Sequence, residues 1–367
     1  MSASFRAWPL IILMLAACSH HGRTPASRIY YSGPPSDHFD GEKFFNPEGE
    51  QGSGGAQRDG RKQFLSIAFG KAKHAAWPAS VPVTPTRPEA RVEGEAMRVT
   101  WIGHATTLVQ TQGLNILIDP VWSHRDSPVA FAGPKRVRAP GVRLEDLPKI
   151  DLVLISHNHY DHLDIGALRR IVNRDKPLIV TGLGNDTLLR EHGIAALARD
   201  WGQGVEVRPD VKVILTRAHH WSAHWTDDQD RALWCGFFVT LPGGGVYYAG
   251  DTGAGRMRWA REASRNGPIR LAILPVGPYH VSAPPSGNHM DPDQAVSAFN
   301  QLEPAYALGV HWGTFELTDE PIDGPPTRLR AALDRQGIAA SRFRTLEAGQ
   351  AWDVPPLVTR TAYRQTP

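Results

Sequence analysis

The stretch from Ser156 to His162 places three histidines and one aspartate within six consecutive positions. Imidazole nitrogens and carboxylate oxygens are the ligands that borderline divalent metals prefer, so one loop carrying them could chelate a metal ion. The alternative is a polar loop whose histidines make only local hydrogen bonds. We favour the metal site because so many ligand side chains lie together: His157, His159, Asp161 and His162.

The elements around this loop suit a ligand site. Residues 151–155 form a short apolar run, which is typical of a strand buried on both faces. Asp164 predicts the N-cap of a helix over residues 165–172. The loop therefore connects a strand to a helix, at the strand edge where α/β sheets usually bind ligands.

Three further candidate ligands, His220, Asp251 and His311, also come after apolar runs that predict strands. Each is a weak signal by itself. A histidine at a strand end commonly caps the strand or lies in the core, and the run from Gly250 to Gly253 could be only a turn. Together with the loop they provide seven ligands at one sheet edge, the number that a two-metal hydrolase needs.

Many short strands interleaved with fewer helices predict an α/β layered sandwich. The expected strands lie near residues 98–102, 106–109, 115–119, 151–155, 205–207, 211–215, 237–241, 246–249, 271–274 and 306–310. The expected helices lie near residues 165–172, 184–192, 293–302 and 326–335, and a turn at 112–113 joins two of the strands. We place one hydrolase domain at residues 95–355 and a C-terminal tail at 356–367.

Residues 19–94 have the composition of a tether and an extended arm, with a short helix expected over 61–77 and a proline-rich linker over 78–88. Phe39, Phe44 and Phe45 indicate that part of this arm packs on the domain.

The first eighteen residues predict a secretory signal, with an apolar run that ends in Leu15-Ala16-Ala17-Cys18. This ending resembles a bacterial lipobox, which implies that Cys18 is acylated and anchors the chain to a membrane of the cell envelope. Ser19 favours the periplasmic side of an outer membrane. The alternative is an ordinary signal peptide with an incidental cysteine. The other cysteine, Cys235, lies in an apolar run and is expected to be a buried core thiol rather than a ligand or nucleophile.

The bulk composition narrows the class of protein. The chain has 367 residues, of which 41% are hydrophobic and 21% charged, enough for one large domain or two small ones. The net charge is only +3 and no long basic run is present, so no nucleic-acid partner is indicated.

The order of the ligand motifs resembles the metallo-β-lactamase superfamily. The finer motifs, such as Trp101–Thr106, Ile118–Pro120, Ala249–Gly253 and His311–Phe315, are similar to the branch that contains N-acylphosphatidylethanolamine-hydrolysing phospholipase D. This resemblance implies a four-layer αβ/βα sandwich with a dinuclear metal site at one sheet edge. It also implies that the metals, for which zinc is expected although iron and manganese accept the same ligands, activate water for attack on phosphorus.

The resemblance assigns roles to the residues. His157, His159 and His220 would hold one metal, Asp161, His162 and His311 the other, and Asp251 would bridge them. Asp161 could also orient the nucleophile, and His289 could contact the phosphate or assist the leaving group. His104 and Asp119 are either residues that orient the ligand imidazoles or simple turn residues. His219, His224 and His280 are expected at the surface or at the rim of the site.

One segment departs from the branch. The branch continues Ala-Tyr-Glu-Pro-Arg after the residues that match Pro275–Gly277, whereas this chain has Pro278-Tyr279-His280-Val281-Ser282. The first hypothesis is a membrane-tethered phosphodiesterase that acts on a phospholipid. The second is a lactonase, amidase or soluble phosphodiesterase of the same fold. The third is a metal-stabilised binding protein of the envelope, which a set of seven ligands disfavours because a structural zinc site needs only four.

Overall fold

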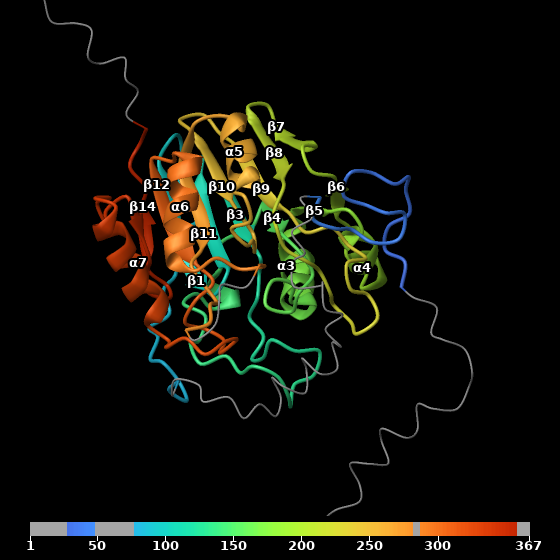
Figure 1. Ribbon diagram of the computed structural model, residues 1–367, viewed down its shortest axis with the longest axis horizontal. Helices are drawn as coiled ribbons and strands as arrows, with labels where there is room; N and C mark the ends of the chain where they lie inside the picture. Colours follow the sequence, from blue (N-terminus) through green and yellow to red (C-terminus); the bar gives the residue numbers. More distant parts are fainter. Residues whose placement is uncertain (1–27, 48–76, 282–286, 358–367) are drawn as a thin grey trace, which may run out of the picture.

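The computed structural model describes residues 28–47, 77–281 and 287–357. The expected signal segment with Cys18, most of the expected helix over 61–77, and most of the C-terminal tail lie outside these ranges. Within them, no helix has the length and apolar character needed to cross a bilayer. Two seven-stranded sheets pack face to face, with helices on their outer sides (Figure 1). This arrangement confirms the predicted α/β sandwich.

The first sheet carries the loop with the densest ligands. Its strands, in spatial order, are β14 (Ala351–Asp353), β1 (Met97–Gly103), β2 (Thr106–Thr111), β3 (Leu114–Ile118), β4 (Leu152–Ile155), β5 (Leu178–Gly182) and β6 (Leu197–Arg199). β3 to β6 are parallel, and β1 to β3 form an antiparallel meander. The turn between β2 and β3 lies at Gln112 and Gly113, as predicted, and both residues have positive φ angles of 55° and 68°.

The second sheet supplies the remaining ligands. Its strands, in spatial order, are β13 (Phe343–Arg344), β12 (Tyr306–Val310), β11 (Ile269–Pro275), β10 (Gly245–Tyr248), β9 (Gly236–Thr240), β8 (Val211–Thr216) and β7 (Gly204–Arg208). β10 to β13 are parallel. β9 is antiparallel to both β8 and β10, so β8 runs in the same direction as β10.

Helices cover the outer faces of both sheets. α3 (Ile165–Asp175) and α4 (Asn185–Glu191) lie beside the first sheet, and α5 (Arg258–Ala263), α6 (Pro292–Leu302) and α7 (Gly324–Arg335) lie over the second (Figure 1). Two short 3-10 turns, η2 (Leu144–Asp146) and η3 (Ser264–Asn266), complete the described elements. Asp164 caps α3 as predicted, because its Oδ1 accepts a hydrogen bond of 2.9 Å from the Ala167 amide.

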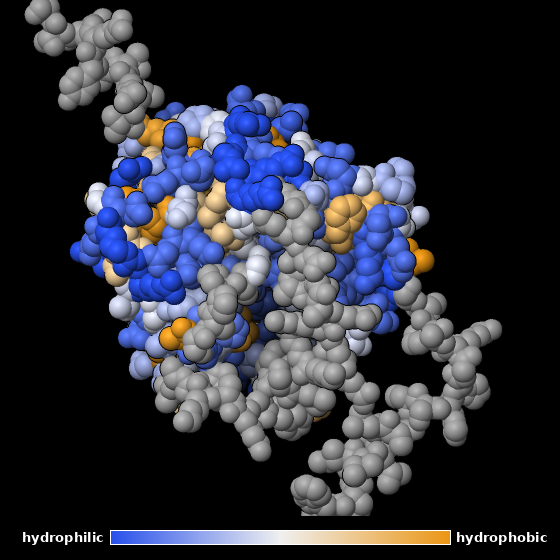
Figure 2. Space-filling model, in the orientation of Figure 1, coloured by the Kyte–Doolittle hydropathy of each residue, from blue (hydrophilic) through white to orange (hydrophobic). Residues whose placement is uncertain are grey.

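The hydrophobic side chains form a large core and a smaller one. The larger core fills the space between the sheets and continues under α5, α6 and α7, and the smaller one lies between the first sheet and the helices α3 and α4. Cys235 is buried in the larger core, as predicted. The outer surface is largely hydrophilic in the view of Figure 2, although Phe131 and Val281 are 83% and 62% exposed.

The described part of the arm packs on the domain. Phe39 and Phe44 are buried in a third cluster with Leu233 and Trp234, whereas Phe45 is 40% exposed. The proline-rich linker is also fixed to the domain: the Val81 and Thr86 amides donate hydrogen bonds to carbonyls of the segment 137–141. The arm is therefore part of the folded body in these ranges.

The sequence missed several elements. β5, β6, β13, β14 and α5 were not predicted, and Asp119 lies just after β3 rather than within it. The missed strands are short, apart from β5, and three of the five elements lie at sheet edges, where little burial marks them. The other expected strands and helices that lie within the described ranges occur within a few residues of their predicted bounds.

Candidate metal centre

Strand direction brings the predicted ligands to one edge of the sandwich. The loop from Ser156 to His162 follows β4, and Asp251 and His311 come shortly after β10 and β12, which run in the same direction. His220 follows β8, which is parallel in direction to β10. Because parallel strands end at the same edge of a sheet, side chains distant in sequence meet there.

Three of the predicted ligands form a first half-site. His157 Nε2 lies 2.8 Å from His159 Nδ1, and His220 Nε2 lies 3.3 Å from the same His159 atom. These three nitrogens converge from two loops, and such a set could hold a metal ion. This is the grouping that the family resemblance implied for the first metal.

The remaining ligands form a second half-site. His311 Nε2 lies 3.3 Å from Asp161 Oδ2, and His162 Nε2 lies 3.7 Å from the same oxygen. Asp251 Oδ2 lies 3.2 Å from His162 Nε2, 3.1 Å from His311 Nε2 and 3.8 Å from His220 Nε2. Asp251 therefore stands between the two half-sites, in the place expected of a bridging ligand.

The side chains fit divalent metals in their chemistry. The Nε2 atoms of His162 and His311 are buried and lie 3.1 to 3.3 Å from carboxylate oxygens of Asp251 and Asp161. Crowding imidazoles and carboxylates together in a buried site is costly unless a ligand satisfies them, and a metal ion would do so. The donor set of imidazole nitrogens and carboxylate oxygens is the one that zinc, iron and manganese accept.

The electrostatics of the centre also favour a cation. Burial lowers the pKa of His157 and His220 well below the ordinary range, which leaves their nitrogens free to bind a metal. Burial opposes the charge of His162 as well, but the carboxylates of Asp251 and Asp161 raise its pKa well above the ordinary range. The same negative field that favours an imidazolium would favour a divalent ion.

Asp119 orients ligand histidines rather than serving as a simple turn residue. His162 Nδ1 donates a hydrogen bond of 2.7 Å to Asp119 Oδ2, so Nε2 is the nitrogen that faces the centre. Ser156 Oγ donates to the same oxygen over 2.6 Å and lies 3.0 Å from His157 Nδ1. Fixing the ring and tautomer in this way is the usual task of groups behind metal ligands.

His104 plays a comparable part for Asp161. Its Nε2 lies 2.9 Å from Asp161 Oδ2, and its ring centroid lies 3.9 Å from that of His311. The Thr314 hydroxyl accepts a hydrogen bond of 2.9 Å from the His104 amide. His104, Asp119 and His311 all have positive φ angles, of 54°, 42° and 63°. A left-handed conformation is unfavourable for such residues, so the packing around the centre holds all three in place.

The first half-site has supports from distant segments. His220 Nδ1 donates a hydrogen bond of 2.9 Å to the Asn288 carbonyl, which fixes its tautomer. Asn46, from the N-terminal arm, donates through Nδ2 to the His220 carbonyl over 2.8 Å. His224 donates through Nδ1 to the Asn158 carbonyl inside the ligand loop, also over 2.8 Å. The expectation of a surface or rim position is thus wrong for His224 and also for His219, because both are buried.

His289 lies where a substrate could reach it. Its Nδ1 is 3.6 Å from Asp251 Oδ2, and its side chain remains 21% exposed. Its ring centroid lies 5.1 Å from that of His220 and 5.5 Å from that of His311. His280 lies farther out at the rim, with its Nδ1 3.1 Å from Asp319 Oδ1.

The glycines beside Asp251 are required for close approach of the chain. Gly250 has φ +63°, and a Cβ there would lie 2.6 Å from the Cys235 carbonyl oxygen. A Cβ on Gly253 would lie 1.7 Å from the Gly287 carbonyl oxygen. The second contact sets the segment that contains Asn288 and His289 against the Asp251 turn.

The sequence missed the supporting residues Ser156, Asn288, Tyr248, Thr314 and Asn46. Ser156 was visible at the start of the ligand loop, and a hydroxyl next to a ligand histidine was the only available signal. The others lie far from their partners in the sequence, so no local pattern pointed to them.

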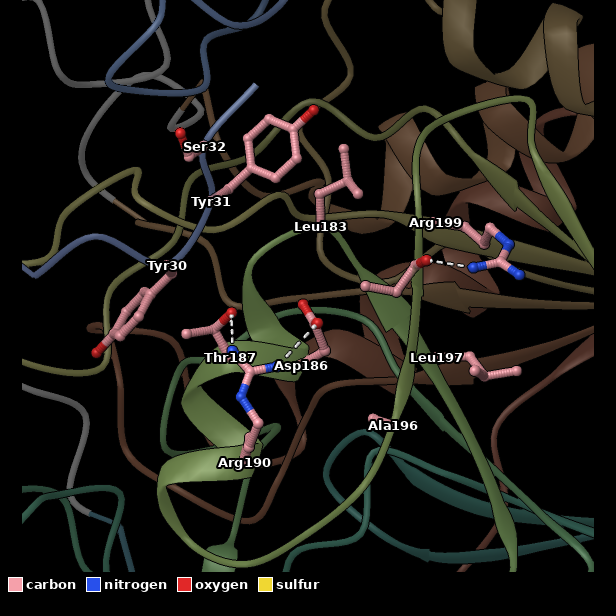
Figure 3. A pocket seen from close by; sticks show the side chains of 11 residues that line it. Tyr30, Tyr31, Ser32, Leu183, Asp186, Thr187, Arg190, Ala196, Leu197 and Arg199 are labelled. Carbon is pink, nitrogen blue, oxygen red and sulfur yellow. Dashed lines mark hydrogen bonds and ion pairs between the residues drawn. The ribbon is translucent and has the colours of Figure 1, made fainter. Parts of the chain in front are cut away.

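A separate cavity of about 440 Å³ lies away from the ligands. The arm, α4 and β6 line it, and Figure 3 shows Tyr30, Arg190 and Arg199 at its walls. None of the predicted site residues lines this cavity. Arg190 is engaged by Asp186 and by the Thr187 hydroxyl. This shallow cavity is therefore not part of the candidate metal centre.

Comparisons with known proteins agree with the fold. A family described as a β-lactamase superfamily domain matches residues 114–312. N-acyl-phosphatidylethanolamine-hydrolyzing phospholipase D 1 of Caenorhabditis elegans is 31% identical over 332 residues, which span 85% of this chain and 93% of that protein. The mitochondrial protein of the same name from Saccharomyces cerevisiae is 32% identical over 249 residues, which span 65% of this chain and 52% of that protein.

A solved structure also agrees with this fold. The metallo hydrolase Igni18 of Ignicoccus hospitalis has 25% sequence identity and a TM-score of 0.54, over 70% of this chain and 97% of that protein.

Proposed function

The chain belongs to the β-lactamase superfamily and is a metal-dependent hydrolase, and on that premise we propose that it is a dinuclear phosphodiester hydrolase with phospholipase D regiochemistry. Its substrate would be N-acylphosphatidylethanolamine or a related phospholipid. The observation that carries the proposal is the position of Asp251, within 3.8 Å of ligand nitrogens from both half-sites. The Caenorhabditis elegans relative, which matches most of this chain, supports the choice of substrate.

The ligand side chains divide into two metal positions. His157, His159 and His220 would hold one ion, and Asp161, His162 and His311 the other, with Asp251 shared between them. When bound, two divalent cations, for which we expect zinc, would stabilise charge on phosphoryl oxygens and bring the pKa of water near neutrality.

The protein side chains would position the reactants. Asp161 is held by His104 and faces the centre with Oδ2, where it could orient a water molecule for attack on phosphorus. His289 is partly exposed beside Asp251 and would contact the phosphoryl group or give a proton to the leaving oxygen. The bond between phosphorus and the leaving alcohol oxygen would break, and the products would be phosphatidic acid and an N-acylethanolamine.

The predicted lipid anchor at Cys18 adds a cellular location to this proposal. An acylated Cys18 would keep the centre beside an envelope membrane, on the periplasmic side of an outer membrane, where a phospholipid substrate is at hand. The support for this anchor is the lipobox-like ending of the apolar segment at Leu15-Ala16-Ala17-Cys18. Labelling with a radioactive fatty acid, with Cys18→Ala as the control, tests it directly, and equal labelling of both chains would contradict it.

The activity is tested on vesicles that contain N-acylphosphatidylethanolamine in phosphatidylcholine. The full chain is loaded with zinc and its metal content is measured, and mass spectrometry then follows phosphatidic acid and N-acylethanolamine. We expect both products from the wild type and from His192→Ala, which alters a histidine outside the ligand set, and neither from His311→Ala. Fully metallated protein that releases neither product would refute the substrate, and a lactone, an amide and a soluble phosphodiester would then be assayed in parallel.

A further inference from the structure

Asp119 has an unusually complete set of hydrogen-bond donors behind the metal centre. Its Oδ2 accepts from Ser156 Oγ over 2.6 Å, from His162 Nδ1 over 2.7 Å and from the Tyr248 hydroxyl. Its Oδ1 accepts from the Ser156 amide over 2.8 Å. Three of the four donors therefore converge on Oδ2, and one reaches Oδ1. Asp119 and its partners are fully buried, and no water can replace a lost donor without a rearrangement.

This network reaches both half-sites. His162 of the second half-site donates directly to Asp119. His157 of the first half-site is linked through Ser156, whose Oγ donates to Asp119 and lies 3.0 Å from His157 Nδ1. The link to His162 is therefore direct, while the link to His157 runs through a second hydroxyl.

Among these donors, Tyr248 is the one that lies outside the ligand loop. Ser156 and His162 belong to the ligand loop, whereas Tyr248 comes from the end of β10 in the opposite sheet. Its ring is held between the sheets, 1% exposed, so its hydroxyl is a fixed donor rather than a mobile one. The Asp119 backbone, with φ 42°, is unfavourable by itself and needs such outside contacts to persist.

We propose that Tyr248 is a positioning residue that holds Asp119 from the opposite sheet and thereby fixes the His162 imidazole for metal binding in the second half-site. Without the phenol, Oδ2 loses its donor from the opposite sheet and keeps those from Ser156 and His162, so the carboxylate turns toward the ligand loop. The His162 ring then loses its alignment. Removal of groups behind a metal ligand typically weakens metal binding about 10-fold to 100-fold.

The neighbouring tyrosine provides a matched control. Tyr247 precedes Tyr248 on β10, is equally buried and points to the other face of the strand, where its ring stacks on Trp259. Its hydroxyl faces the Thr216 side chain and not Asp119. Tyr247→Phe therefore removes the same atom from the same strand without touching Asp119.

The experiment measures metal affinity in each half-site separately, using the full chain and Co²⁺ as the probe. The His159→Ala background weakens the first half-site, and the His311→Ala background weakens the second. Tyr248→Phe and Tyr247→Phe are each placed in both backgrounds. Titration against a chelator gives the affinities, and the Co²⁺ absorption spectrum reports the ligand geometry. Neither readout depends on any substrate, so the result is independent of the proposed phospholipase activity.

We expect Tyr248→Phe to weaken Co²⁺ binding about tenfold or more in the His159→Ala background and to change the spectrum there. In the His311→Ala background we expect less than a threefold change, and Tyr247→Phe should be silent in both. Equal affinities and spectra for the two tyrosine variants would overturn the proposal. A loss of the same size in both half-sites, together with a lower melting temperature, would also overturn it, because it would show a general loosening of the fold.

Discussion

The buried carboxyl of Glu320 predicts a measurable change of stability with pH. Glu320 lies nine residues after His311 and is only 2% exposed. Its Oε2 has no hydrogen-bond partner among the residues that the structure describes. Burial raises the pKa of this carboxyl to about 7, and the nearby His311 and backbone amides offset only part of that effect. The perturbation is Glu320→Gln, which keeps the shape of the side chain and removes its titration.

The sign follows from the direction of the pKa change. The folded-state pKa is raised, so the contribution of Glu320 to stability is fully present below its ordinary value of 4.5 and is lost as the pH rises through about 7. One pKa unit corresponds to about 1.4 kcal/mol, so the whole effect is worth about 3 kcal/mol. Part of it is already lost at pH 5. Between pH 5 and pH 8 the wild type should therefore lose about 2.5 kcal/mol that the Glu320→Gln variant keeps.

Urea unfolding at pH 5, 6, 7 and 8 measures this difference on protein freed of metal by a chelator. Subtracting the wild-type free energy of unfolding from that of the variant cancels the other titrating groups. Glu303→Gln is the control, because Glu303 is exposed at the end of α6. A difference between wild type and Glu320→Gln that stays constant across this pH range would refute the assignment of a neutral buried acid.

Three further outcomes follow from the contacts. Removal of metal by a chelator should lower the melting temperature, because an ion at a hundredfold excess over its Kd stabilises the fold by about 2.7 kcal/mol; an unchanged melting temperature would contradict metal binding. Asp164→Ala should lower the free energy of unfolding in urea by about 1–2 kcal/mol. The reason is that this side chain caps α3 and also accepts hydrogen bonds from the Trp122 and Ser123 amides. Asp186→Ala on α4, whose carboxylate makes no capping hydrogen bond, should lower it by less. Gly253→Ala should reduce the rate of hydrolysis at least tenfold while the helical circular dichroism is retained. The added Cβ would lie 1.7 Å from the Gly287 carbonyl and would displace the segment that contains His289. Full activity of this variant would show that the segment is not needed.

The candidate ligands could be predicted to lie together because the ends of strands are easy to locate in the sequence. Each candidate followed an apolar run, and parallel strands deliver such positions to one edge. Asp251, His220 and His311 could therefore be grouped with the dense loop before any coordinates were known. The pairing of ligands into half-sites came from the family resemblance and not from the residues. The structure brings the same groups together at distances of 2.8 to 3.8 Å.

The supports behind the ligands were not predictable in the same way. Tyr248 and Asp119 are separated by 129 positions, and Asn46 and His220 by 174. Such contacts depend on how two sheets and an arm pack, and no periodicity within a strand encodes them. His224 was wrongly expected at the surface or rim because a loop histidine is usually exposed, whereas here the Asn158 carbonyl and the Tyr160 ring enclose it.

The segment after β11 is held at the rim of the candidate centre by contacts to its backbone. The Tyr279 carbonyl accepts a hydrogen bond of 2.7 Å from the Thr318 hydroxyl, and the Val281 amide donates to Asp319 over 3.0 Å. Both contacts use the backbone of the rim segment, so they do not depend on the side chains at positions 279–281. The path of this segment beside His311 can therefore be kept when its side chains change. In this chain the segment carries an exposed Val281 and a His280 that is paired with Asp319. The charge of this rim is therefore set by residues other than the candidate metal ligands.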